Sequence, residues 1–140
     1  MSSEPKQLLT AQQITQLISQ SVPLSDMQGF YTDEINLPAV RCILPFKPTQ
    51  VRHGNTISGP IIMALADAAM YALLLAVDEK NLNAVTRDFQ IQFLSRPAAQ
   101  DLIAVAHLIK DSSKHTLMRV EILSNDKLVA HVTGSYAKPS

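Results

Sequence analysis

The chain has 140 residues, of which 46% are apolar and 17% are charged, and its 12 acidic residues balance its 12 basic ones. This composition is typical of a folded globular protein and argues against disorder. A net charge of zero without a Lys/Arg run argues against nucleic acid and anionic membranes as partners. The lone Cys42 excludes an internal disulfide, and the opening MSSEPKQLLTAQQ lacks the features of a signal peptide. We therefore expect a cytoplasmic protein.

The first half of the chain is predicted to contain a helix, two short strands and a second, longer helix. Residues 7–20 place apolar side chains on one helical face, and the following SVPLSDMQG ends that helix. Residues 30–46 favour two short strands that meet near Asn36–Pro38. The polar segment KPTQVRHGNT reads as a connection, and the long helix is predicted over residues 60–78.

The second half of the chain is predicted to form strands. They are expected at residues 84–94, 101–110, 115–123 and 127–137, with short hairpin turns between the last three. One long helix with five to six hairpin-joined strands indicates an α+β fold with an antiparallel sheet. A helix that is apolar all round must be covered all round, so the sheet is expected to curl around it and a second copy to cover the rest. We expect one domain over 1–140, with a helix and linker in 1–27 and the core in 28–137.

The long helix carries one carboxylate inside the most apolar stretch of the chain. The stretch reads SGPIIMALADAAMYALLLAV from Ser58 to Val77, and Asp67 stands near its centre. As a membrane span, its aliphatic residues would gain about 3.5 kcal/mol, whereas a central Asp costs about 3 kcal/mol. These contributions nearly cancel and no basic residue flanks the N-terminal side, so we do not expect a membrane protein. A structural acid and a catalytic acid remain as explanations.

The start of this helix has features of an oxyanion-binding site. Ser58 or Gly59 can cap the helix and Pro60 suits its first turn, where free N–H groups and the positive end of the dipole can polarise a carbonyl. Asp67 could orient or deprotonate a water. Gly59 and Asp67 are separated by about 12 Å along a helix, whereas a carbonyl and its attacking water lie within about 3–3.5 Å. Two antiparallel copies of the helix across a two-fold axis could bring them together.

At these residues the chain resembles the hot-dog acyl-CoA thioesterases of the phenylacetate-degradation type. That family carries H-G-G at the start of its central helix and then L-x-D, which here read Ser58-Gly59-Pro60 and Leu65-Ala66-Asp67. The strand AVTRDFQIQFLSRPA also resembles the family's strand after the helix. The resemblance covers roughly residues 28–137. It implies a curved antiparallel sheet around a central helix, that is, the hot-dog fold, and hydrolysis of an aliphatic or aryl acyl-CoA.

The resemblance also implies roles for individual residues. Gly59 falls where the family uses a backbone N–H to bind the thioester oxygen, and Asp67 falls on the catalytic acid, acting as general base or nucleophile. Thr86 matches a hydroxyl position that helps to hold the water. Each of these residues also has a purely structural explanation. Asp67 could be a paired structural acid, Gly59 could serve a tight turn into the helix, and Thr86 is a good strand residue.

The chain departs from the family motif at the helix start. Ser58 replaces the usual His and is a candidate substrate contact, while Pro60 replaces the second Gly and removes one donor. The Asn that commonly precedes the motif is here Arg52. Asn55 and His53 lie close by in the sequence and are the remaining candidates for substrate binding. The acid is therefore expected to be intact, and the part that polarises the substrate is altered.

The resemblance implies a homodimer, with a dimer of dimers as an open alternative, and no metal or cofactor apart from the coenzyme A of the substrate. Two alternatives to a thioesterase remain: a non-catalytic acyl-CoA-binding dimer, motivated by the altered motif, and an enoyl-CoA hydratase or dehydratase, which the missing His disfavours. Arg96, Lys110 and Lys114 could meet the coenzyme A phosphates, although ordinary surface charge is the simpler explanation.

Overall fold

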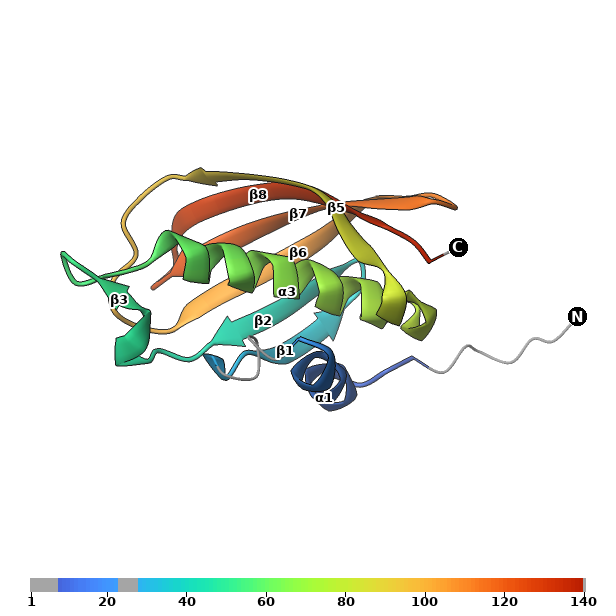
Figure 1. Ribbon diagram of the computed structural model, residues 1–140, viewed down its shortest axis with the longest axis horizontal. Helices are drawn as coiled ribbons and strands as arrows, with labels where there is room; N and C mark the ends of the chain where they lie inside the picture. Colours follow the sequence, from blue (N-terminus) through green and yellow to red (C-terminus); the bar gives the residue numbers. More distant parts are fainter. Residues whose placement is uncertain (1–7, 23–27, 140) are drawn as a thin grey trace, which may run out of the picture.

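The computed structural model describes residues 8–22 and 28–139, and its main feature is a curved antiparallel sheet around one long helix (Figure 1). The six strands follow the order β1-β2-β6-β7-β8-β5 across the sheet. They are β1 (Tyr31–Asn36), β2 (Ala39–Leu44), β5 (Val85–Phe93), β6 (Leu102–Asp111), β7 (His115–Ser124) and β8 (Lys127–Ala137). This arrangement is the hot-dog fold, so the predicted fold class is confirmed.

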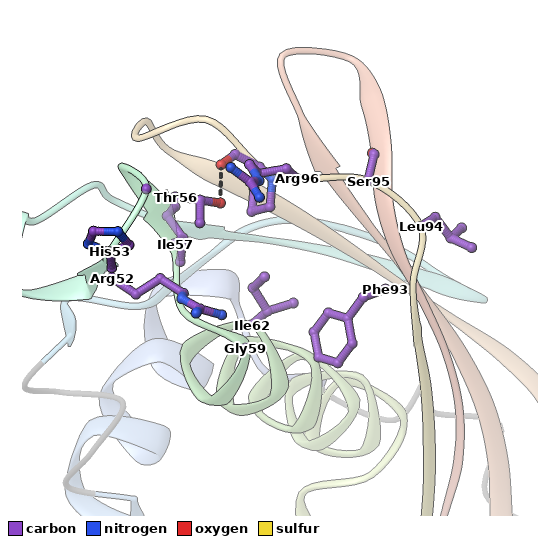
Figure 2. Close-up of a pocket in the computed structure, with 12 residues that line it drawn as sticks. Arg52, His53, Thr56, Ile57, Gly59, Ile62, Phe93, Leu94, Ser95 and Arg96 are labelled. Carbon is purple, nitrogen blue, oxygen red and sulfur yellow. Dashed lines mark hydrogen bonds between the residues drawn. The ribbon is translucent and has the colours of Figure 1, made fainter.

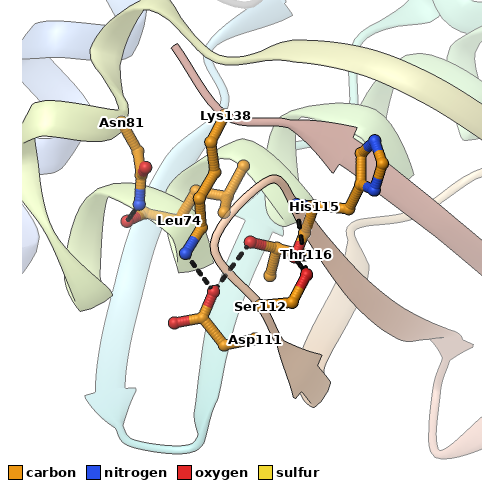
Figure 3. A network of polar contacts seen from close by, with 7 residues as sticks. All are labelled: Leu74, Asn81, Asp111, Ser112, His115, Thr116 and Lys138. Atoms are coloured by element: carbon orange, nitrogen blue, oxygen red, sulfur yellow. Dashed lines mark hydrogen bonds and ion pairs between the residues drawn. The ribbon is translucent and has the colours of Figure 1, made fainter. Parts of the chain in front are cut away.

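The central helix, α3 (Gly59–Val77), lies across the inner face of the sheet. It begins after Ser58, whose backbone is extended and whose side chain makes no capping hydrogen bond. At the other end, the Asp78 N–H and the Asn81 side-chain amide both donate to the Leu74 carbonyl (Figure 3), so a carbonyl of the last turn is satisfied within the core. Twelve of its 19 residues are buried. The segment that is apolar enough to cross a membrane is therefore the buried central helix of this fold.

The strands bury one face against α3, and small residues allow the helix to approach. Leu102, Ala104 and Ala106 of β6 are all fully buried, which follows from the period-two alternation of a strand. In β8, a Cβ added at Gly134 would lie 2.9 Å from the Met70 sulfur and 2.9 Å from the Asp88 carbonyl oxygen. Glycine at this position therefore lets α3, β5 and β8 pack together.

A second helix, α1 (Ala11–Ser21), covers a side of α3 that the sheet leaves open. Thr10 and Gln13 form a capping box at its start, and Ile14 and Ile18 are fully buried. Part of the cover of α3 therefore comes from α1 within the chain, while Met63 on the same helix remains 40% exposed. The expectation that a second copy covers the rest stays a prediction. The predicted start of this helix at Gln7 and the linker residues 23–27 lie outside the described residues.

The four strands predicted in the second half are all present within one residue of their expected ends. The polar connection before α3 holds more structure than predicted. It forms a 3₁₀ turn, η1 (Pro48–Gln50), and a short hairpin of β3 (Val51–Arg52) and β4 (Thr56–Ile57). Gly54 and Asn55 adopt positive φ angles of 95° and 57° in its turn, which glycine and asparagine tolerate best.

Candidate active site

Asp67 is held from two strands on the partly exposed side of α3. The Thr86 hydroxyl of β5 donates to Asp67 Oδ1 at 2.9 Å, and the Tyr136 hydroxyl of β8 donates to the same oxygen at 2.8 Å. Among the described residues, none donates to Oδ2. The carboxylate is thus fixed through one oxygen, while the other is available to a water or a substrate.

This carboxylate borders an open pocket of about 500 Å³. The pocket is also lined by Tyr71, Val85 and the two hydroxyl donors. Asp67 is half-buried, so it keeps access to solvent at the edge of an apolar helix. The lone carboxylate of the apolar helix is thus stabilised by two hydroxyl groups rather than by a cation, and it faces a cavity rather than the core.

Tyr136 was missed by the sequence analysis. Its ring stacks on Tyr71 with centroids 6.2 Å apart and planes at 9°, and it is almost fully buried. Burial, followed by the negative charge of Asp67, raises the pKa of Tyr136 well above its ordinary value. The phenol therefore keeps its proton and remains a donor. The only signal in the sequence was an aromatic residue at an inward position of the last strand, and its register opposite Thr86 arises from strand pairing.

Gly59 lies in a different pocket, of about 690 Å³, at the start of α3 (Figure 2). Phe93 and Ile62 form part of its apolar wall. The same pocket is also lined by Arg52, His53 and Arg96. A Cβ added at Gly59 would meet only the Phe93 ring, at 3.5 Å, which is ordinary contact. No close contact therefore requires glycine here, and its φ angle is not positive. The turn into the helix still favours glycine, because Pro60 disfavours a helical backbone at a preceding residue that has a side chain.

The N–H of Gly59 is free of protein partners within the described part of the chain. It belongs to the first residue of α3, where no intrahelical acceptor exists. Neither the Ser58 side chain nor another described group accepts from it. A donor of this kind at the positive end of a helix can bind a developing oxyanion.

The residues predicted for the site fall into two groups on one chain. Asp67 and Thr86 share one pocket, and Gly59 and His53 share the other. Of the described residues, Asn55 and Ser58 line neither pocket. One chain therefore holds the acid and the free N–H in separate cavities, as their spacing along the helix requires.

Within residues 8–22 and 28–139, no group of His, Cys, Asp or Glu side chains is arranged to hold a metal ion. His107 instead contacts Glu121 at 3.1 Å. The groups available for chemistry in the two pockets are the Asp67 carboxylate, the hydroxyl groups that bind it and the backbone N–H of Gly59.

Comparison with known proteins defines the class. Residues 54–131 match the model of the thioesterase superfamily, so the chain belongs to that family. The match begins in the β3–β4 turn and includes α3, β5, β6, β7 and the start of β8. It therefore contains Gly59, Asp67 and Thr86 but neither His53 nor Tyr136. No curated protein sequence matches the chain significantly.

Solved structures agree on the fold. A proposed thioesterase from a Silicibacter species superposes with a TM-score of 0.85 at 26% identity, covering 96% of this chain and 95% of its own. A thioesterase from Haemophilus influenzae superposes with a TM-score of 0.83 at 17% identity, and the alignment covers 94% of this chain and 92% of that one. The N33D mutant of the phenylacetic acid degradation protein PaaI from Thermus thermophilus superposes with a TM-score of 0.75 at 21% identity. That alignment covers 84% of this chain and 99% of the other.

Proposed function

We propose that this protein hydrolyses an acyl-CoA thioester to a free acid and coenzyme A. The observation that carries the proposal is Asp67, held through Oδ1 by two hydroxyl donors and left open at Oδ2 beside a cavity, on the fold of a thioesterase superfamily member. A carboxylate with this geometry is suited to general-base catalysis. No observation favours hydration of an enoyl-CoA over hydrolysis.

The proposed reaction needs a water, a base and an oxyanion donor. Asp67 Oδ2 takes a proton from the water while the water oxygen attacks the thioester carbonyl carbon. The carbonyl oxygen becomes an oxyanion and accepts from the Gly59 N–H. The oxyanion then re-forms the carbonyl as the C–S bond breaks, and the thiolate leaves with the electron pair. It takes up the proton that Asp67 accepted from the water, so the products are the acid and the thiol and the carboxylate is regenerated. Thr86 and Tyr136 hold the carboxylate during these steps.

We further propose that Gly59 and Asp67 meet across a homodimer formed through β5. This strand pairs only with β8 among the described strands, so its other edge is open. Several large apolar side chains along it are exposed, including Val85 (62%), Phe93 (51%) and neighbouring Leu94 (52%). An open apolar edge strand is suited to pairing with another chain.

The two ends of β5 mark the two halves of the proposed site. Phe93 lies beside Gly59 at one end, and Thr86 binds Asp67 at the other. Antiparallel pairing of β5 with β5 of a second copy, about a two-fold axis near its middle, would bring the Phe93 end of one chain to the Thr86 end of the other. Each dimer would then contain two equivalent sites. A dimer of dimers remains open.

The reaction is expected to take place in the cytoplasm. Cys42 is buried and makes no disulfide, and burial raises its pKa to about 12. Its thiol is therefore unreactive at neutral pH. The expected location rests on the chain having a single cysteine.

The direct test is thiol release from a panel of aliphatic and aryl acyl-CoAs. We expect at least one member to be hydrolysed by the wild-type protein without an added metal or cofactor. Binding of coenzyme A without turnover of any member would instead support the non-catalytic binding dimer.

Replacing Tyr136 by phenylalanine should separate the hydroxyl from the ring. The ring can still stack on Tyr71, but Asp67 Oδ1 loses one of its two donors. We expect kcat to fall about tenfold with KM nearly unchanged, since a hydrogen bond to a charged group is lost.

Tyr71→Phe is the matched control for this variant. It removes a hydroxyl from the stacked neighbour, which donates to the Leu82 carbonyl and not to Asp67. We expect its kcat to remain close to that of the wild type. Equal losses of kcat in both variants would indicate a structural effect of the tyrosine pair and would contradict a positioning role for Tyr136.

A further inference from the structure

A second, smaller cavity adjoins the Gly59 pocket at Arg96. That cavity has a volume of about 260 Å³ and is lined by Gln100, Ser124 and Lys127 among others. Arg96 lines both cavities and therefore forms their common wall. The two hollows together extend from the start of α3 past the end of β5 to the β7–β8 turn.

The charges along this path all have one sign. Four side chains that are cationic or can become so line the two cavities, and we call them the basic track: Arg52, His53, Arg96 and Lys127. No aspartate or glutamate lines either cavity; Asp126 is in the adjoining turn but is not a lining residue. In a chain with equal numbers of acidic and basic residues, this is a local separation of charge that favours an anion.

Some other cations of the chain have carboxylate partners. Lys138 contacts Asp111 at 2.6 Å (Figure 3), and Arg41 contacts Asp33 at 3.2 Å. Within the described part of the chain, no residue of the basic track forms an ion pair. Its charges are thus free to pair with a ligand.

The segment that carries Arg96 is anchored on both sides. The Thr56 hydroxyl of β4 donates to the Pro97 carbonyl at 2.7 Å in a buried position (Figure 2). On the other side, the N–H groups of Leu94 and Ser95 donate to the Val129 carbonyl of β8. The guanidinium also passes close to the β3–β4 turn, since a Cβ added at Gly54 would lie 3.5 Å from Arg96 Nη1. Arg96 is therefore held at the junction of the two cavities by the fold.

We propose that the basic track binds the phosphate groups of the substrate's nucleotide handle, with Arg96 and Lys127 as its principal contacts. Guanidinium groups bind phosphate bidentately, and Lys adds a point charge. The thioester end would lie at Gly59, and the handle would leave through the junction at Arg96 toward Lys127. This inference rests on the proposed function. It also separates Arg96 from Lys110 and Lys114, which line neither cavity.

The test compares one acyl group on two thiols. Arg96→Ala and Lys127→Ala are each expected to raise KM for the acyl-CoA about tenfold, with kcat nearly unchanged. With the same acyl group on pantetheine, which lacks the phosphates, neither variant should change KM. Added salt should raise KM only for the acyl-CoA, because exposed charges are screened.

Lys110→Ala and Lys114→Ala are the matched controls, and both should behave as wild type. An equal rise in KM for both thiols in the Arg96 variant would assign the track to the acyl group or to structure and would overturn the proposal. Calorimetric binding of adenosine 3′,5′-diphosphate provides a measurement that needs no turnover. If no thioester is hydrolysed but this probe binds wild type and binds Arg96→Ala about tenfold more weakly, the proposed reaction fails while the phosphate site stands. If the probe binds both proteins equally or not at all, the site is refuted.

Discussion

Replacement of Asp67 by asparagine is expected to lower kcat by about 10²- to 10⁴-fold, which is the usual contribution of a general base. The asparagine side chain keeps an Oδ1 that can accept from Thr86 and Tyr136, so the local hydrogen bonds survive. Its Nδ2 replaces the open Oδ2 and cannot take a proton from water. Thiol release from the best acyl-CoA measures the rate, and thermal unfolding checks that the fold is retained.

Asp126→Asn is the control for this substitution. Asp126 is an exposed aspartate in the β7–β8 turn with φ 64°, where asparagine is well tolerated. Its turnover should equal that of the wild type. Unchanged hydrolysis by a folded Asp67→Asn variant would refute the role of Asp67 as base.

Loss of the Gly59 N–H is expected to lower kcat by about 10²- to 10³-fold, as for other oxyanion donors. Gly59→Pro removes this N–H and adds a ring, which the first position of a helix accommodates. The preceding Ser58 already has φ −68° and ψ 148°, the conformation that a following proline requires. Gly59→Ala keeps the N–H and adds a methyl group in ordinary contact with Phe93. Both variants place a side chain before Pro60, which disfavours a helical backbone at the preceding residue. Gly59→Ala is therefore the matched control for any loss of stability, and its kcat should remain close to that of the wild type.

Pairing the two inactive variants tests whether the site is shared between chains. A purified heterodimer of Asp67→Asn and Gly59→Pro chains contains one site in which the intact Gly59 of one chain faces the intact Asp67 of the other. We expect it to regain about half the activity of the wild-type dimer, because one of two equivalent sites is restored. Each mutant homodimer should stay inactive. A heterodimer with no more activity than its parents would show that each chain carries a complete site and would overturn the β5 dimer as the catalytic unit.

Local patterns in the sequence predicted most of the fold correctly. The alternation in residues 84–137 and the long apolar run after Ser58 depend on neighbouring residues, and β5 to β8 and α3 appear where those patterns indicate. The β3–β4 hairpin was missed, because it has only two residues per strand, too few for an alternation to be recognised. The cover that α1 gives to α3 was also missed, since helix packing between distant segments leaves no periodic signal.

The sequence by itself determined that an acid and a helix start lie on one buried helix, too far apart to act together in one chain. That conclusion needs only the rise per residue of a helix. The tertiary structure decided what surrounds them, because the partners come from strands far away in sequence. Strand pairing sets Tyr136 opposite Thr86, and both then point at Asp67. In the same way, the anchoring of the segment after β5 brings Arg96 to the pocket of Gly59, and no spacing in the sequence could have indicated this.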